Sequence, residues 1–194
     1  MNARHFLASA AFLAGALTAP AAFAHTFGAH GYGFAEGFLH PFLGIDHLLA
    51  MVAVGLWAAQ LGGAALWRVP LAFVAVMAIG ALCAQSGVSP TFLEAAIAAS
   101  VLALGILVAC RLRVSGVLSL LLAALFAVSH GYAHGLEMPQ AAAPSGYGLG
   151  FMLATASLHG LGILIGLGLG RQRALLRTGG AAIALAGLWL MTTA

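Results

Sequence analysis

The stretch His40-Pro41-Phe42-Leu43-Gly44-Ile45-Asp46-His47 decides the fold class and points to a site. It places two imidazoles and a carboxylate inside a segment that is otherwise apolar enough to lie in a membrane. An ionisable group in lipid is costly, so by default it faces the protein interior or a water-filled path and marks a functional site. The stretch therefore predicts an integral membrane protein with a polar site inside its membrane region.

The composition around this stretch supports the same fold class. Hydrophobic residues make up 63% of the 194 residues and charged residues only 6%, whereas a soluble domain carries roughly 25% charged residues. Apolar runs of membrane-spanning length recur along nearly the whole chain. The net charge of +3 comes from arginines that stand between these runs. This pattern orients a membrane protein and does not make a nucleic-acid-binding patch.

Residues 1–24 have the features of a cleavable signal peptide. Arg4 gives a positive start, an apolar core follows, and Ala22-Phe23-Ala24 is a small-x-small cleavage site. We expect the mature chain to begin at His25. The alternative is an uncleaved extra span, for which the apolar core is short.

Residues 25–194 are expected to form one all-α, polytopic domain with six transmembrane helices. Each predicted span is close to the ~20 residues that a bilayer requires, and the spans cover residues 36–62, 69–87, 91–110, 114–135, 147–170 and 178–194. With an outer N-terminus, every arginine after the signal peptide falls on the cytoplasmic side, in agreement with the positive-inside rule. We therefore expect a bacterial inner-membrane protein with both mature termini in the periplasm.

A glycine ladder within the fifth predicted span concerns helix packing. Gly162, Gly166 and Gly170 follow one another at intervals of four residues. Small residues at this spacing let helix backbones approach closely in lipid. We interpret the ladder as packing inside one subunit, with a dimer face as the alternative.

We interpret several residues outside the polar stretch as having structural roles. Cys83 and Cys110 are expected near opposite membrane faces, as small buried side chains that cannot bridge. Trp57 and Trp67 are interpreted as interface anchors. Glu94 begins the third predicted span, where a carboxylate favours the helix N-terminus.

The first polar cluster lies early in the first predicted span. His40 and His47 are seven residues apart, so they share one helix face. Asp46 points to a neighbouring face, where it either orients an imidazole N–H or binds metal itself. Pro41 removes a backbone donor and Gly44 loosens the same turn, so we expect a broken or kinked helix that lines a polar cavity.

A second cluster, in the run His130-Gly-Tyr-Ala-His134-Gly-Leu-Glu137, repeats the chemistry in the fourth predicted span. Its two imidazoles and its carboxylate share one helix face. Both clusters should lie near the outer membrane face. We therefore expect a shared path, with Glu36, His40, His130, His134 and Glu137 at the mouth and Asp46, His47 and His159 deeper.

Mixed imidazole and carboxylate ligands suit Ni, Zn, Co, Cu or Fe. The sequence has no cluster of thiolates, which argues against a Cu(I) site. For His159 an alternative stays open, in which the ring is hydrogen-bonded to a carbonyl group of the next helix. His25 and His30 either capture metal or belong to a solvated tail.

Both clusters resemble the signatures of the HupE/UreJ family. The first, with Met51 after it, resembles H-P-x-x-G-x-D-H-x-x-x-M, and the second resembles H-G-x-A-H-G-x-E. Ser129 stands where the second motif usually has Phe. The resemblance covers the whole chain and implies a nickel permease, with cobalt in some members. It also implies that the metal is carried by His40, Asp46, His47, His130, His134 and Glu137.

We therefore expect a permease that imports a divalent transition metal, Ni²⁺ before Co²⁺, as its substrate and without a permanently bound cofactor. The G-x-x-x-x-G-K-[ST] motif is not present in the sequence, so we expect no ATP as partner. The expected partners are the metal ion and the lipid bilayer, and a homo-oligomer is open.

We expect no enzymatic activity. The alternatives are a membrane-embedded zinc hydrolase and a metal-binding accessory or sensor protein. Protonation of imidazole competes with metal, so uptake should weaken as the pH falls through the imidazole range.

Overall fold

The computed structural model describes residues 33–88, 90–139 and 142–194, and every regular element within these ranges is an α-helix. The predicted signal peptide, together with His25 and His30, lies outside the described residues. Each predicted span coincides with a helix, except that the first is divided into two. The helices are α2 (Gly33–Leu43), α3 (Ile45–Leu61), α4 (Ala65–Ala84), α5 (Leu93–Ala109), α6 (Gly116–Glu137), α7 (Pro144–Gly168) and α8 (Arg173–Leu190).

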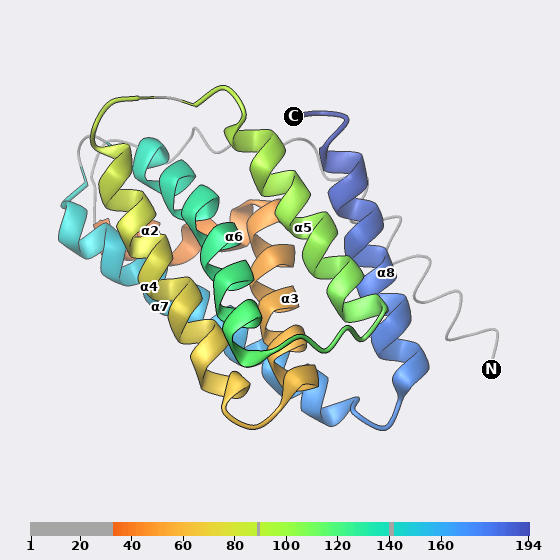
Figure 1. Ribbon diagram of the computed structural model, residues 1–194. Helices are drawn as coiled ribbons and strands as arrows, with labels where there is room; N and C mark the ends of the chain where they lie inside the picture. The colour runs from red at the N-terminus through yellow and green to blue at the C-terminus, as the bar shows by residue number, and fades with distance from the viewer. Residues whose placement is uncertain (1–32, 89, 140–141) are drawn as a thin grey trace.

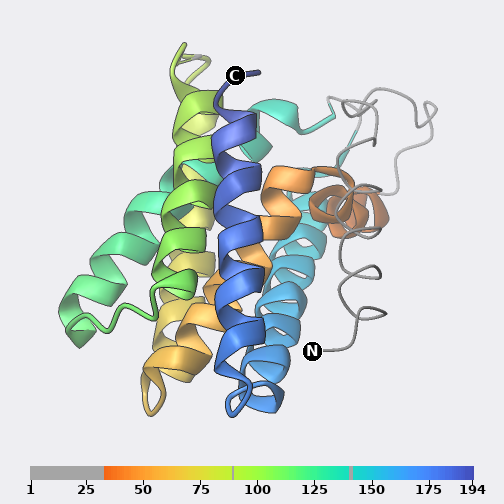
Figure 2. The same cartoon turned by 90° about the vertical axis from the view of Figure 1, so that its right-hand side faces the viewer.

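A sharp bend at Gly44 separates α2 from α3. The two helix axes differ by 83°, and Figure 2 shows α2 lying across the axis along which α3 runs. Gly44 has an extended backbone (φ −93°, ψ 117°), and its carbonyl accepts the N–H of Leu48 at 2.9 Å, which begins α3. The expected break in the first predicted span is therefore confirmed.

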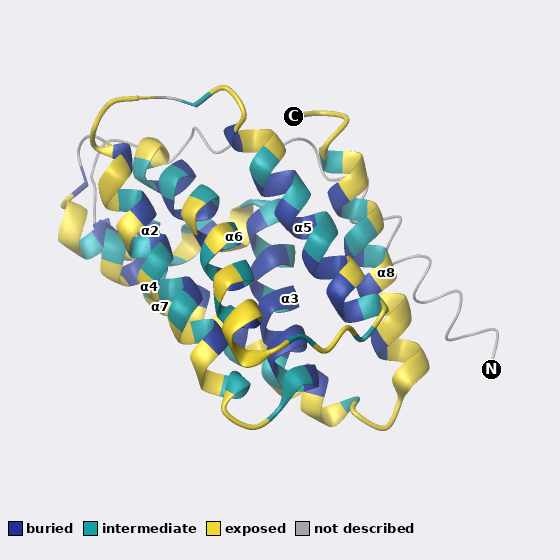
Figure 3. Cartoon of the chain, viewed as in Figure 1, coloured by how far each residue is buried: buried dark blue, intermediate teal, exposed yellow. Residues whose placement is uncertain are grey.

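Helix α3 is the centre of the bundle (Figure 1). It packs on α7 and also contacts α4 and α5, while α4 pairs with α6 and α5 with α8. Residues on all sides of α3 are buried, among them Met51, Val54 and Trp57, which are fully inaccessible. A helix that is apolar all round belongs in a protein core, and Figure 3 shows this buried helix behind more exposed ones.

Three described helices, α4, α6 and α7, are long and apolar enough to cross a membrane, and the bent pair α2–α3 makes a fourth candidate. Helix α5 is apolar but shorter, with 17 residues. Many large apolar side chains of α4, α6 and α7 are exposed, as expected for contact with lipid tails. Four of them are between 61% and 69% exposed: Leu82, Leu121, Leu125 and Leu164. The fold is thus an all-helical membrane protein, and the six-span count stays a prediction.

Charge is separated between the two ends of the bundle. The connections α3–α4, α5–α6 and α7–α8 lie at one end, and the α4–α5 connection and the C-terminus lie at the other (Figure 1). We call the first the arginine end, because every arginine within the described ranges lies in or beside its connections: Arg68, Arg111, Arg113, Arg171, Arg173 and Arg177. This distribution is the one that the predicted topology requires.

The glycine ladder is confirmed only in part as a packing device. A Cβ atom at Gly162 would overlap the Val52 carbonyl oxygen of α3, and one at Gly166 would lie 2.6 Å from the Ala59 side chain. These two glycines therefore let α7 approach α3 inside one subunit. Gly170 lies beyond the end of α7 and meets only its own chain neighbours, so its assignment to the ladder is wrong.

Two further interpretations need correction. Cys83 and Cys110 are exposed instead of buried, although they do lie at the C-terminal ends of α4 and α5 and hence at opposite ends of the bundle. Trp57 is fully buried, and its indole N–H donates to the Leu112 carbonyl at 3.4 Å, so it is not an interface anchor. Trp67 is 57% exposed, as an anchor would be.

Candidate metal site

The outermost part of the site joins α2 to the end of α6. His40 Nε2 lies 2.9 Å from Glu137 Oε2, and His134 Nδ1 lies 3.8 Å from the same oxygen. One potential ligand atom from each of these three residues lies within 4.8 Å of the other two. His134 and Glu137 are neighbours because they are three residues apart on α6, and the bend at Gly44 brings His40 to them. We call these three residues the outer set.

Imidazole rings continue inward from the outer set. The ring centroids of His40 and His134 are 4.8 Å apart, and His134 is 4.1 Å from His47. His47 is in turn 4.7 Å from His130. The four rings come alternately from the bent pair and from α6, so the two sequence clusters converge in space. That these rings bind metal stays a prediction.

The two inner rings have polar partners on one nitrogen each. Asp46 Oδ1 lies 2.7 Å from His47 Nδ1 and also accepts the backbone N–H of His47 at 2.7 Å. Ser100 Oγ, from α5, lies 2.8 Å from His130 Nε2. Asp46 is therefore placed to orient His47, which is one of the two roles that the sequence left open.

Several ring nitrogens in this series are buried and have no hydrogen-bond partner among the described residues: His47 Nε2, His130 Nδ1 and both nitrogens of His134. Buried polar atoms are nearly always hydrogen-bonded, so each exception requires an explanation. A neutral imidazole nitrogen with a free lone pair is a common metal ligand. The arrangement can therefore present one ligand atom after another to a cation that moves along the rings.

His130 lies deeper than the sequence analysis placed it. The sequence predicts it at the mouth with His134, but the two are four residues apart on α6, which runs toward the end that holds Glu137, so His130 lies about 6 Å further in. Its ring is completely buried and lies 5.8 Å from the Phe73 ring. His130 thus belongs to the inner part of the site, beside His47.

Glu36 and His159 do not belong to the outer set. His159 contacts Phe73, with 5.2 Å between the two ring centroids, and neither of its nitrogens has a partner in the described part of the chain. The alternative of a hydrogen bond to a neighbouring carbonyl is therefore not seen. Glu36 has one buried carboxylate oxygen without a partner in those same ranges. Whether either residue contacts metal stays a prediction.

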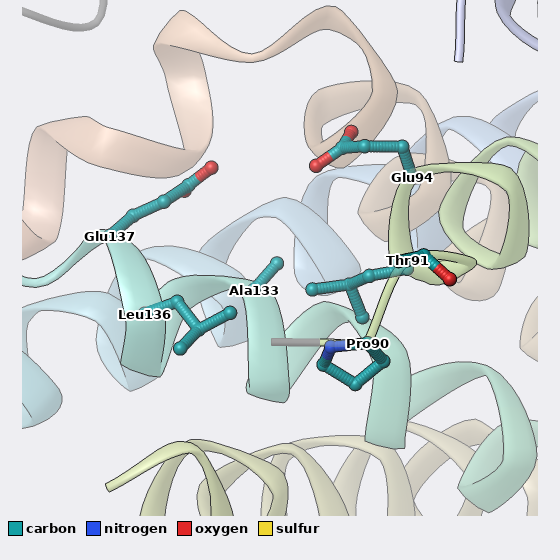
Figure 4. Close-up of a pocket in the computed structure, with 7 residues that line it drawn as sticks. Pro90, Thr91, Glu94, Ala133, Leu136 and Glu137 are labelled. Atoms are coloured by element: carbon teal, nitrogen blue, oxygen red, sulfur yellow. The ribbon is translucent and has the colours of Figure 1, made fainter. Parts of the chain in front are cut away.

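A cavity of about 180 Å³ opens beside Glu137, between the start of α5 and the end of α6. It is lined by Pro90, Thr91, Leu93, Glu94, Ala133, Leu136 and Glu137, and Figure 4 shows both carboxylates on the same side of it. Glu94 does lie in the first turn of α5, as interpreted from the sequence. It also gives this cavity a second acidic group, which makes the cavity attractive to cations.

Sequence reasoning missed four residues that contact the imidazoles, among them Phe73, whose ring lies 5.8 Å from His130 and 5.2 Å from His159. Ser100 had a signal, because it is a lone polar residue inside an apolar helix. Tyr147 and Phe151, whose rings lie 5.9 Å from His40 and 3.8 Å from His134, had none. Aromatic side chains are common in apolar spans, and only the packing of α7 on α2 brings these two to the site.

Known proteins resemble this chain over most of its length. The family described as HupE / UreJ protein matches residues 13–190. A protein named Protein HupE, from Rhizobium leguminosarum bv. viciae, is 44% identical over 166 residues, which cover 84% of this chain and 87% of that protein. The search of solved structures found no match. The sequence motifs, the helical membrane fold and these matches together show that the chain belongs to the HupE/UreJ family.

Proposed function

We propose that this protein is an inner-membrane permease that imports a divalent transition-metal ion, with Ni²⁺ as the first candidate and Co²⁺ as the second. The observation that carries the proposal is the unbroken series of four imidazole rings that leads from Glu137 into the buried interior. Mixed nitrogen and oxygen ligands suit these metals. The family resemblance supports the same assignment.

The proposed mechanism is ligand exchange along the series. The hydrated ion first exchanges water for the carboxylate and imidazoles of the outer set. It then passes to His47 and His130 by gaining one ring nitrogen as it loses another. Conduction requires sites that bind well enough to admit an ion and weakly enough to release it, so several partial sites serve better than one closed site.

The proposal includes the predicted organisation of the chain. Residues 1–24 form a cleaved signal peptide, and residues 25–194 form one domain with six spans and periplasmic termini. The acidic cavity beside Glu137 then faces the periplasm, and the arginine end faces the cytoplasm. His159 and Glu36 complete the proposed set of metal-binding residues, at the inner and outer limits of the path.

The decisive experiment is uptake of radiolabelled Ni²⁺ by cells that express the wild type, His47→Ala or Asp46→Asn. We expect both variants to reduce uptake to the level of cells without the protein, because each removes an inner ligand or its orienting carboxylate. Membrane fractionation must show equal amounts of protein. Thr178→Ala, an exposed position at the arginine end, should transport like the wild type. Undiminished uptake by both site variants would refute the proposal.

A second candidate is a membrane-embedded zinc hydrolase. The outer set offers three ligands beside an open cavity, and catalytic zinc sites have three protein ligands and an open position. The metal content of the purified protein distinguishes the candidates. Stoichiometric zinc that survives dialysis favours the enzyme, and readily exchanged metal favours the permease. An accessory or sensor protein would bind metal but support no uptake.

A further inference from the structure

Ser100 is a buried hydroxyl in the middle of α5, with 1% of its surface exposed. Its Oγ lies 2.7 Å from the Ile97 carbonyl oxygen and 2.8 Å from His130 Nε2. A carbonyl oxygen can only accept a hydrogen bond, and a serine hydroxyl has one hydrogen to donate. The hydroxyl therefore donates to Ile97 and accepts the Nε2–H of His130.

This pair of hydrogen bonds fixes the tautomer of His130. A neutral imidazole carries hydrogen on one nitrogen only. When that nitrogen is Nε2, the lone pair lies on Nδ1, which is the buried ring nitrogen without a partner in the described structure. A hydrogen on Nδ1 as well would be a buried donor without an acceptor, which is unfavourable.

His47 has the opposite arrangement. The Asp46 carboxylate accepts from Nδ1–H at 2.7 Å, so the lone pair of His47 lies on Nε2, which is also buried and unpartnered within the described ranges. The two rings are 4.7 Å apart and nearly perpendicular, at 87°. The carboxylate partner of His47 thus leaves the Nε2 lone pair available, and the hydroxyl partner of His130 leaves the Nδ1 lone pair available on the neighbouring ring.

We infer that Ser100 is a positioning residue that holds His130 with Nε2 protonated, so that Nδ1 is the atom offered to a metal ion. Asp46 does the same for Nε2 of His47. Ser100 itself touches no ion and acts only through the ring. The tautomer is a property of the metal-free protein, and only the consequence for transport rests on the proposed function.

The first test is nitrogen NMR of metal-free purified protein labelled in its histidine rings, with the His130 signals assigned by their loss in His130→Gln. We expect a protonated Nε2 and a bare Nδ1 in the wild type. Ser100→Ala should give a mixture of tautomers, and Ser100→Thr, which keeps the hydroxyl, should restore the wild-type pattern. A wild type with Nδ1 protonated, or an unchanged pattern in Ser100→Ala, would overturn the inference.

Ser119→Ala is the matched control. Ser119 is also a buried serine, 2% exposed, whose hydroxyl donates to the carbonyl three residues earlier, Gly116, at 2.8 Å. Within the described part of the chain the Ser119 hydroxyl makes no hydrogen bond to a histidine, so its removal should leave the His130 pattern unchanged. If Ser100→Ala fails to accumulate, Ser100→Cys has the same purpose, because a thiol is only a weak acceptor.

The second test is the concentration dependence of Ni²⁺ uptake. We expect Ser100→Ala to lower the maximal rate about tenfold, as loss of a partner that orients a ligand does in metal sites. The apparent KM should hardly change, because the ion is first captured by the outer set. Ser100→Thr should recover the rate, and Ser119→Ala should match the wild type. Wild-type kinetics in Ser100→Ala would refute the role in transport, whereas absence of uptake by the wild type would refute the proposed function and leave the NMR result standing.

Discussion

A single carboxylate oxygen, Glu137 Oε2, is shared by two imidazoles from different helices. It lies 2.9 Å from His40 Nε2 and 3.8 Å from His134 Nδ1, while 45% of the Glu137 side chain remains exposed. The negative charge is thus accessible to an ion from solution and is already in contact with the next ligands. At the residue scale, the proposed function makes Glu137 the residue that first binds the ion and passes it to the ring series.

We predict that Glu137→Gln raises the apparent KM for Ni²⁺ uptake by at least about tenfold, because an amide keeps the shape but loses the charge, and even the loss of a partner that only orients a ligand costs about 10–100-fold in metal affinity. Glu137→Asp keeps the charge on a shorter side chain and should retain more of the affinity. The measurement is the concentration dependence of uptake. Equal KM values for the wild type and Glu137→Gln would contradict this role.

Gly44 provides a second prediction at the residue scale. Its backbone angles suit any residue, but an added Cβ would lie 2.8 Å from Asp46 Oδ1 and 3.2 Å from His47 Nδ1. We therefore expect Gly44→Ala to displace the Asp46–His47 pair and reduce uptake several-fold while the protein still accumulates in the membrane. Gly116→Ala is the control, because a Cβ there meets open space. Normal uptake by Gly44→Ala would show that the pair tolerates the displacement.

At the element scale, the positions of the helices were predictable and their pairing was not. Runs of apolar residues separated by Arg, Pro and Gly predict where a helix lies, and the weakness at Pro41 and Gly44 predicted the break. The 83° size of the bend has no signal in the sequence. Ser100 stands out in the sequence as a lone polar residue in the middle of α5, but the rest of this helix is too uniformly apolar to indicate that His130 is its neighbour.

The α3–α7 interface offers a matched pair of glycines. A Cβ at Gly162 would overlap the Val52 carbonyl oxygen of α3, whereas a Cβ at Gly160 on the same helix meets open space. We expect Gly162→Ala to lower the free energy of unfolding by about 1–3 kcal/mol through overpacking. Gly160→Ala should be neutral or stabilising by up to about 1 kcal/mol, from helix propensity. Unfolding in mixed detergent micelles measures both, and equal stability of the two variants would contradict the close approach.

At the scale of the whole molecule, positive and negative side chains are separated: the arginines lie at one end of the bundle and the acidic residues lie away from it. The four acidic residues of the chain lie in α2, in the first turns of α3 and α5, and in the last turn of α6, away from the arginine end. The convergence of the two polar clusters could be predicted from their shared depth. The acidic cavity could not, because Glu94 reaches it only through the packing of α5 beside α6.

We predict that added salt slows the capture of metal at low concentration. The acidic cavity attracts cations over a distance that shrinks from about 30 Å at 0.01 M ionic strength to about 10 Å at 0.1 M, and steering by such fields affects association rates. The initial uptake rate well below KM should fall with salt, while the rate at saturating Ni²⁺ should change little. Glu94→Gln should weaken the salt dependence, and a rate independent of salt would exclude steering.

The bend at Gly44 also determines which helix termini, with their partial charges, lie at the site. Because α3 begins inside the molecule, its N-terminal end, equivalent to about half a positive charge, lies beside the imidazoles, and the carboxylate of Asp46, which accepts the His47 N–H, offsets this charge. The last turn of α6 brings the opposite pole, about half a negative charge, to Glu137. A cation therefore meets a more strongly negative surrounding at the outer set than at His47, where the start of α3 offsets part of the Asp46 charge. We expect it to rest longest at the outer set, so the step inward limits the rate of passage.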